Sequence, residues 1–196
     1  MAKIGLIRHG ITEWNIAGRA QGLSDIPLNG EGREQALRLA GRLSKEPWDL
    51  MISSHLCRAR ETAEIIAAAS GIEEHLIDER ICEMDCGQLE GLNEAEWLGR
   101  WGPDWRSLEL GMKKAEDVSR RGALVLEELY TRYSDKKVLV VSHGALIGLT
   151  LRHLLPQVFT TTYIDNTSLT LLTKTNSKWD CLLYNCVEHL AEVFAG

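Results

Sequence analysis

Two histidines of this chain share one local setting. The motifs Arg8-His9-Gly10 and Ser142-His143-Gly144 each follow an apolar run and each precede a predicted helical segment. A neutral imidazole with one free nitrogen can act as a nucleophile, and a neighbouring arginine fork can bind phosphate. A lone histidine after a strand is more often structural, but the repeated setting favours a functional site.

Two further side chains extend this set. Arg58 falls in the first turn of a predicted helix after Ser53-Ser54, where a cation opposes the helix dipole. That placement is tolerated where the guanidinium and the helix N-terminus bind one anion together, although an exposed arginine is the alternative. Glu83, followed two residues later by Asp85, adds a carboxyl group.

Strand and helix patterns alternate along the chain, which is typical of an α/β fold. Strands are predicted at 3–7, 50–53 and 138–141, helices at 31–44, 57–69, 113–133 and 145–155, and a late hairpin at 168–173 and 178–184. Parallel strands end at one edge of their sheet, where ligands of open α/β folds bind. We therefore expect both His-Gly motifs at that edge.

Residues 84–111 interrupt this alternation. The segment holds five glycines together with Trp97, Trp101 and Trp105, which are three of the six tryptophans. Their spacing of four places them near one helical face, although Gly102-Pro103 must end that helix. A small satellite core is the favoured interpretation, and a tryptophan-rich lid over a pocket is the alternative.

Composition narrows the class of protein. The 196 residues are 44% hydrophobic and 26% charged, which excludes a disordered or fibrous chain. The net charge of -6 gives no basic field for nucleic acid or anionic membrane. The first residues predict no signal peptide, and no apolar run approaches the roughly 18 residues of a membrane span, so we expect a cytoplasmic protein. Five cysteines without a CxxC pair favour free thiols.

Taken together, the motifs resemble the histidine phosphatase superfamily, in its phosphoglycerate mutase-like branch. The match runs in order from Leu6 to Leu190 and rests on the segments Leu6 to Asn15, Gln21-Gly22, Ser53-Ser54 with Arg58-Ala59, Glu83, Ser142-His143-Gly144, and Asn185 with His189-Leu190. The resemblance implies a three-layer sandwich with a mostly parallel central sheet flanked by helices. It also implies a single domain over residues 1–196, with a lid-like excursion at about 84–111.

The resemblance also implies roles for individual residues. His9 is the expected nucleophile and Glu83 the expected proton donor and acceptor, while Arg8, Arg58 and His143 surround the phosphoryl oxygens. Further phosphate-binding and pocket-wall positions are expected at Asn15, Gln21, Gly22, Gly144 and Ala145. No metal and no other cofactor is expected.

Three functions stay open at this stage. Family mutases are longer and carry a Tyr- and Arg-rich insert, whereas this chain has only a short Trp-rich segment, as in small phosphatases of the broad-specificity or α-ribazole phosphatase type. A phosphomonoester hydrolase of broad specificity is therefore expected, with a phosphoglycerate mutase or a phosphoester-binding module without turnover as alternatives. The expected partner is a small-molecule aryl or alkyl phosphomonoester, with α-ribazole phosphate and phosphoglycerates as named candidates, and the sequence does not predict the oligomeric state.

Basic pairs near residue 115 bear on the mutase alternative. Lys113-Lys114 and Arg120-Arg121 could serve as the cationic contacts of a mutase. Their position at the beginning of a predicted helix favours an ordinary solvated face instead.

Overall fold

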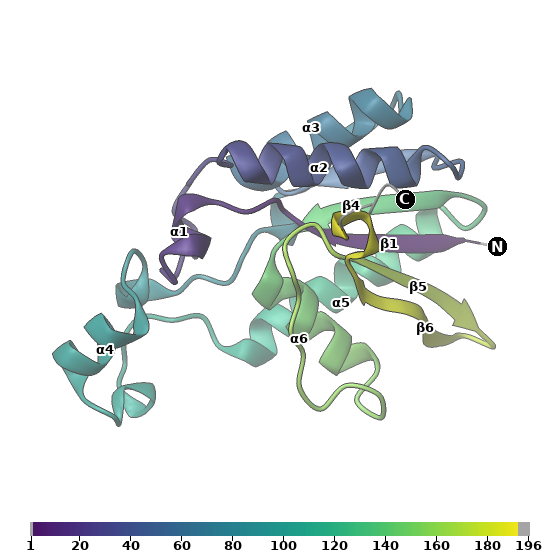
Figure 1. Ribbon diagram of the computed structural model, residues 1–196. Coiled ribbons are helices and arrows are strands. Elements are labelled where there is room, and N and C mark those ends of the chain that lie inside the picture. The colour runs from purple at the N-terminus through teal and green to yellow at the C-terminus, as the bar shows by residue number, and fades with distance from the viewer. Residues whose placement is uncertain (1, 192–196) are drawn as a thin grey trace.

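The computed structural model describes residues 2–191, so Met1 and residues 192–196 of the expected domain lie outside the described part. Six strands form one sheet in the order β3-β2-β4-β1-β5-β6 (Figure 1). Their bounds are β1 Lys3–Arg8, β2 Leu50–Ser53, β3 His75–Ile77, β4 Lys137–Ser142, β5 Leu169–Thr175 and β6 Lys178–Cys186.

The sheet is parallel on one side and antiparallel on the other. β4 pairs in parallel with both β1 and β2, and β2 pairs in parallel with β3. β5 runs antiparallel to β1 and forms the expected hairpin with β6. The central strands β2 and β4 are almost continuously buried, as expected for parallel strands covered on both faces. The predicted mostly parallel sheet is therefore confirmed.

Helices cover both faces of the sheet and make the predicted three layers. Figure 1 shows α2 (Gly30–Leu43) and α3 (Cys57–Ser70) on one face, and α5 (Ala115–Arg132) and α6 (Gly144–Leu154) on the other. A one-turn helix, α1 (Glu13–Ile16), follows the first strand and begins at a capping box built on Thr12.

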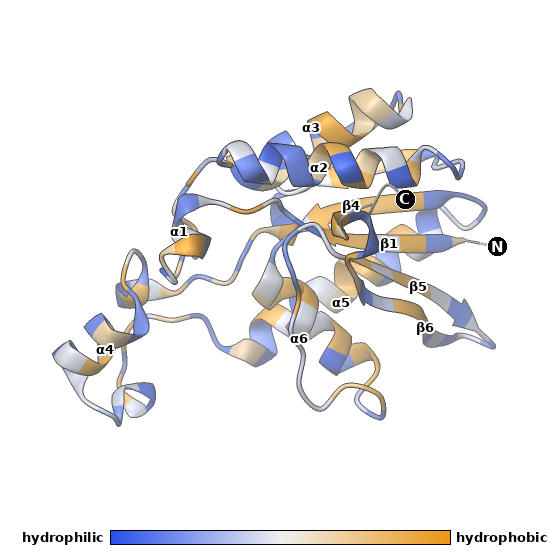
Figure 2. Ribbon diagram, in the orientation of Figure 1, coloured by the Kyte–Doolittle hydropathy of each residue, from blue (hydrophilic) through white to orange (hydrophobic). Residues whose placement is uncertain are grey.

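Side-chain alternation along the strands divides the core between these two helical layers. Val138 and Val140 of β4 belong to the cluster that includes α5 and α6, whereas Leu139 and Val141 belong to the cluster with α2 and α3. Figure 2 shows the central strands mostly in the hydrophobic colour, while α2 also carries hydrophilic positions. Because helices pack on both faces of the sheet, the carboxyl ends of its central strands are held in fixed positions.

The Trp-rich segment forms its own small cluster. Figure 1 shows its helix α4 (Glu94–Trp101) projecting away from the sheet. The helix ends at Gly102, whose positive φ of 71° suits glycine, directly before Pro103. The buried side chains Leu89, Trp105 and Leu110 form the cluster, and Trp97 and Trp101 pack against it.

Membrane crossing is not indicated by the helices. None of those formed by residues 2–191 combines the length and apolar character that a crossing requires.

Candidate active site

The carboxyl ends of β1 and β4 bring the two histidines together. Arg8 pairs with Ser142 in the register of the sheet, and the His9 N–H donates to the Ser142 carbonyl at 3.0 Å. The rings of His9 and His143, one residue further along each strand, have centroids 5.3 Å apart. The strand–His-Gly pattern thus placed both imidazoles at one edge, as predicted.

His9 is held in the form that a nucleophile needs. The side chain is 2% exposed, and its Nδ1 lies 2.7 Å from the Gly10 carbonyl. A carbonyl only accepts, so Nδ1 carries the proton and Nε2 keeps its lone pair. Burial, followed by the charges of Arg8 and Arg58, holds the pKa of His9 well below its usual value. The imidazole is therefore neutral at pH 7.

His143 lies fully buried at the end of β4, against the start of α6. Burial lowers its pKa well below the usual value, and the charges of Arg58 and Arg8 act in the same direction. Both of its ring nitrogens are buried and have no hydrogen-bond partner among residues 2–191. An imidazole buried with both nitrogens unsatisfied costs free energy unless a bound group supplies the partner.

Other predicted site residues also have buried polar atoms without a hydrogen-bond partner among residues 2–191. Within the described chain, Arg8 Nε, Arg58 Nε and Gln21 Oε1 are also buried without a hydrogen-bond partner. Burial lowers the pKa of both guanidinium groups. Arginine stays charged even so, and two buried cations without a directly paired carboxylate favour an anionic ligand.

Arg8 is oriented by the loop that precedes β5. Its Nη1 donates to the Ile164 carbonyl at 2.7 Å. On its other side lies Gly144, where a Cβ would come within 3.3 Å of Arg8 Nε. Gly144 therefore leaves room for the guanidinium, which is a steric role beside the expected phosphate-binding role.

Asn15 is fixed in one orientation. Its Oδ1 accepts from the Thr12 backbone N–H and hydroxyl, both at 3.1 Å, and from Asn166 Nδ2 at 3.3 Å. Asn166 Nδ2 also donates to the His9 carbonyl at 2.9 Å. With Oδ1 occupied as an acceptor, the Nδ2 group of Asn15 is available to donate to phosphate. Sequence reasoning missed Asn166, because nothing in its loop repeats a strand or helix period.

Arg58 is fully buried in the first turn of α3. Its Nη2 and Nη1 donate to the carbonyls of Gly22 and Ser24 at 2.9 and 2.8 Å. The missing cap of this helix comes from Asp25, whose Oδ1 accepts from the Cys57 N–H at 2.6 Å. The alternative of an exposed arginine is therefore wrong.

Glu83 lies against the N-terminus of α6. Its two carboxyl oxygens accept from the N–H groups of Ala145 at 3.2 Å and Leu146 at 3.1 Å, and Oε1 also accepts from Met84 N–H at 2.8 Å. The Ala145 N–H that we expected to bind phosphate thus donates to Glu83. The competing carboxylate, Asp85, instead accepts from the Gly87 N–H at 2.8 Å.

Arg121 on α5 holds the backbone that carries Glu83. Its guanidinium donates to the carbonyls of Arg80 at 3.0 Å, Cys82 at 3.0 Å and Glu83 at 3.2 Å. The solvated face expected for Arg120-Arg121 is therefore wrong for Arg121, although Arg120 is exposed. Helical spacing was the missed signal, because position 121 lies three residues after buried Val118 and four before buried Val125.

The tryptophans lie in the satellite cluster rather than along the cavity beside Glu83. Trp97 and Trp105 stack with ring centroids 5.2 Å apart, and Trp105 is 6% exposed. This packing matches the satellite-core interpretation. Closure of Trp97, Trp101 and Trp105 over substrate stays a prediction.

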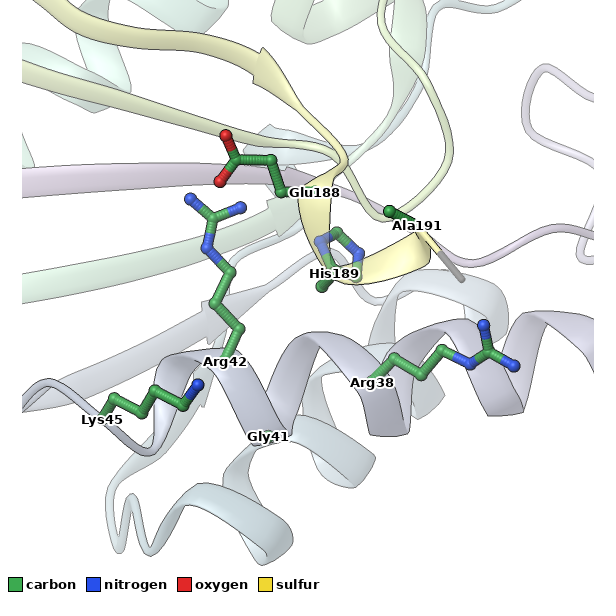
Figure 3. Close-up of a pocket in the computed structure, with 7 residues that line it drawn as sticks. All are labelled: Arg38, Gly41, Arg42, Lys45, Glu188, His189 and Ala191. Carbon is green, nitrogen blue, oxygen red and sulfur yellow. The ribbon is translucent and has the colours of Figure 1, made fainter. Parts of the chain in front are cut away.

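A larger groove lies elsewhere, between α2 and the chain end at 188–191. The groove has a volume of about 790 Å³. Figure 3 shows Arg38, Arg42 and Lys45 on the helix below His189. Burial, followed by the charges of Arg42 and Arg38, lowers the pKa of His189 to about 4. His189 also lies 3.1 Å from the Thr167 hydroxyl, so it supports the loop behind Arg8. The chemistry belongs to the sheet edge, since the predicted set meets there.

Comparison with known proteins agrees with this geometry. A model of the histidine phosphatase superfamily (branch 1) matches residues 4–187. The uncharacterized phosphatase PhoE of Bacillus subtilis (strain 168) is 33% identical over 97% of this chain and 98% of its own length. A mutant phosphoserine phosphatase of Entamoeba histolytica, solved with phosphoserine, superposes with a TM-score of 0.83 at 30% identity, covering 97% of this chain and 100% of its own.

Relatives with mutase names also match. The probable phosphoglycerate mutase GpmB of Escherichia coli O1:K1 / APEC is 36% identical over 76% of this chain and 72% of its own length. Relatives that are named phosphatases support the predicted phosphate-ester hydrolase, which is confirmed, and the mutase is not favoured. The chain belongs to branch 1 of the histidine phosphatase superfamily.

Proposed function

We propose that this chain hydrolyses small phosphomonoesters through a phosphohistidine formed on His9. The buried, neutral His9 imidazole carries this proposal, because its Nδ1 is bound to the Gly10 carbonyl and its Nε2 keeps a lone pair. Arg8, Arg58 and His143 surround it with polar atoms that have no partner among residues 2–191. A phosphoryl group is an anion that satisfies such donors.

The first half-reaction transfers the phosphoryl group to the enzyme. His9 Nε2 forms a bond to phosphorus while the bond from phosphorus to the ester oxygen breaks. Arg8, Arg58 and His143 donate to the remaining phosphoryl oxygens, where charge gathers in the transition state. Glu83 gives a proton to the ester oxygen, so that oxygen leaves as a neutral hydroxyl group rather than as an alkoxide.

The second half-reaction restores the enzyme. Water attacks phosphorus, and the Glu83 carboxylate takes a proton from that water. The bond from phosphorus to His9 Nε2 then breaks, and inorganic phosphate leaves. His9 is again neutral and Glu83 again protonated, so the cycle needs one water and no other reactant.

The leaving group occupies the cavity beside Glu83 in this proposal. The cavity of about 270 Å³ is lined by Leu23, Cys82, Glu83, Asp85, Lys113, Asp117, Val118 and Arg121. Its volume suits the leaving group of a small-molecule phosphomonoester. Its wall carries charges of both signs rather than tryptophan, which favours a small polar alcohol bearing charge, such as a hydroxy acid or an amino acid.

Relatives support this substrate class. The Entamoeba histolytica enzyme is named a phosphoserine phosphatase, and it has been solved with phosphoserine and with 3-phosphoglyceric acid at 30% and 31% identity to this chain. Both compounds are small phosphomonoesters that carry a second charge. We include both as substrates of this chain.

Hydrolysis of p-nitrophenyl phosphate, phosphoserine and 3-phosphoglycerate in EDTA tests the function, with mutase activity measured with and without a bisphosphate primer. We expect hydrolysis in the wild type, none above background in His9→Ala, and a negligible mutase rate. Primed mutase activity with little hydrolysis would replace the phosphatase by the mutase. If the wild type shows neither hydrolysis nor mutase activity, the phosphoester-binding module without turnover becomes the favoured function.

Lys113→Gln tests the leaving-group cavity. Because Lys113 is among the residues that line the cavity, kcat/KM for 3-phosphoglycerate should fall by roughly 10-fold while that for p-nitrophenyl phosphate changes less than about twofold. Lys114→Gln, at the exposed neighbouring position, is the matched control. Equal losses on both substrates would remove Lys113 from substrate recognition.

A further inference from the structure

The guanidinium of Arg58 is held by a loop, and no carboxylate within residues 2–191 pairs with it directly. Its two terminal nitrogens donate to the carbonyls of Gly22 and Ser24 at 2.9 and 2.8 Å. Its Nε is buried and has no partner among residues 2–191. Where this buried cation points is therefore set by where the loop at 22–24 lies.

Glu90, in the Trp-rich segment, fixes that loop. Its Oε1 accepts from the Leu23 N–H at 2.8 Å, and its Oε2 accepts from the Ser24 N–H at 3.0 Å and the Ser24 hydroxyl at 2.7 Å. The loop lies so close that a Cβ on Gly22 would come within 2.0 Å of Glu90 Oε1. Gly22 also has a positive φ of 49°, so both the close contact with Glu90 and the backbone conformation require glycine at this position.

One peptide group joins the carboxylate to the guanidinium. The Gly22–Leu23 peptide offers its N–H to Glu90 and its carbonyl to Arg58. An acceptor with full negative charge on the N–H side polarises the peptide and strengthens its carbonyl as an acceptor. The two charges therefore stabilise each other through a shared peptide.

We propose that Glu90 is a positioning residue for Arg58, acting through the Gly22–Leu23 peptide and Ser24. This inference rests on the proposed function, in which Arg58 binds the transferring phosphoryl group. The Trp-rich segment then contributes to catalysis through one carboxylate at its base. Loosening Glu90 misdirects the guanidinium in the transition state, so kcat falls more than KM rises.

A double-mutant cycle with Glu90→Gln and Arg58→Lys tests this coupling on p-nitrophenyl phosphate. Glu90→Gln keeps the shape but removes the charge and one acceptor, and Arg58→Lys keeps the charge but removes the fork. We expect Glu90→Gln to lower kcat by about 10-fold in the wild type and by less than about threefold in the Arg58→Lys background. Glu94→Gln, an exposed carboxylate on α4, is the control and should leave kcat unchanged.

A merely structural role for Glu90 gives a different result. Its loss would then lower the melting temperature while kcat per folded molecule stayed at the wild-type value, or would lower kcat equally in both backgrounds; either overturns the inference. If Arg58→Lys does not fold, Arg58→Gln replaces it in the cycle, and the same non-additivity is then expected. An inactive wild type would refute the proposed function instead.

Discussion

The sheet edge and the Trp-rich segment treat buried polar groups differently. At the edge, Arg8, Arg58, Gln21 and His143 contribute five buried polar atoms that lack a partner among residues 2–191. In the Trp-rich segment the polar groups mostly satisfy one another. Asn93 and Glu96 form a reciprocal capping box, and Glu96 pairs with Arg19 at 2.9 Å. Trp105 Nε1 is an exception, since it lies in an apolar cluster and has no hydrogen-bond partner among residues 2–191.

This difference indicates that the sheet edge binds a ligand, whereas the Trp-rich segment supports the structure around it. Each unsatisfied buried polar group costs about 1–3 kcal/mol, so a cluster of them persists where a ligand supplies the partners. The satisfied network of the Trp-rich segment instead holds its own shape. The Trp-rich segment contacts the site through Glu90, which accepts from the Leu23 N–H. Helix α5 contacts the site through Arg121, which donates to the Glu83 carbonyl. Variants at the two regions should therefore fail in different ways.

The largest effect is expected from Glu83→Gln, at the sheet edge. Without an acid, hydrolysis of an alkyl phosphate such as phosphoserine should slow by about 10²- to 10⁴-fold. Nitrophenolate leaves readily without a proton, so the loss on p-nitrophenyl phosphate should be much smaller. Steady-state kcat for the two substrates is the measurement, and equal losses would remove Glu83 from the role of acid.

Arg58→Gln and Arg58→Lys separate the charge of this residue from its geometry. Each removes donors to the phosphoryl group and should lower kcat by about 10²-fold. His9 must be neutral to attack, and the Arg58 charge helps to keep its pKa low. Losing that charge raises the pKa of His9, so the acid limb of kcat/KM should move to higher pH in Arg58→Gln.

The lysine variant keeps the charge, and its acid limb should therefore stay near that of the wild type. A pH profile of kcat/KM for the three proteins checks both statements. Identical shifts in the two variants would mean that Arg58 does not act on His9 through its charge.

Arg121→Lys should have an intermediate effect. A lysine cannot bridge the carbonyls of Arg80, Cys82 and Glu83 at once, so the backbone that carries Glu83 should loosen. We expect kcat for phosphoserine to fall by roughly 10-fold with little change on p-nitrophenyl phosphate. Arg120→Lys, at the exposed neighbour, is the control. A loss that does not depend on the leaving group would contradict this positioning role.

The smallest effect on catalysis is expected from Trp101→Ala. Trp101 packs against the satellite cluster, so its loss should lower stability by about 1–3 kcal/mol. Activity on p-nitrophenyl phosphate should stay within about twofold of the wild type. Urea unfolding and steady-state kinetics check the two halves. A large rise in KM with unchanged stability would favour the lid and break the contrast between the two regions.

The sequence predicted the position of a site residue correctly where that residue directly follows a predicted strand or begins a predicted helix. Apolar strands followed by His9 and His143 fixed their common edge, because parallel strands end together. Arg58 followed in the same way from the strand–helix junction at 53–58. The alternation of strands and helices along the chain could be predicted from the same periodicity, whereas the order of the strands in the sheet was not predicted.

The supporting contacts could not be predicted. Asn166 and Glu90 act from irregular loops, and their partners lie far away in the sequence. Glu83 was identified by family resemblance, whereas its position on the N-terminus of α6 required the tertiary structure. Arg121 had a usable helical signal, but its positive charge favoured the solvent-exposed interpretation.

The central claim is that His9 becomes phosphorylated during turnover. Wild-type protein mixed with p-nitrophenyl phosphate and quenched in alkaline denaturant should gain the mass of one phosphoryl group, and fragment spectra should place it on His9. The modification should be absent from His9→Ala. Turnover in the wild type with no phosphorylated enzyme, or with the phosphoryl group on His143, would contradict the account.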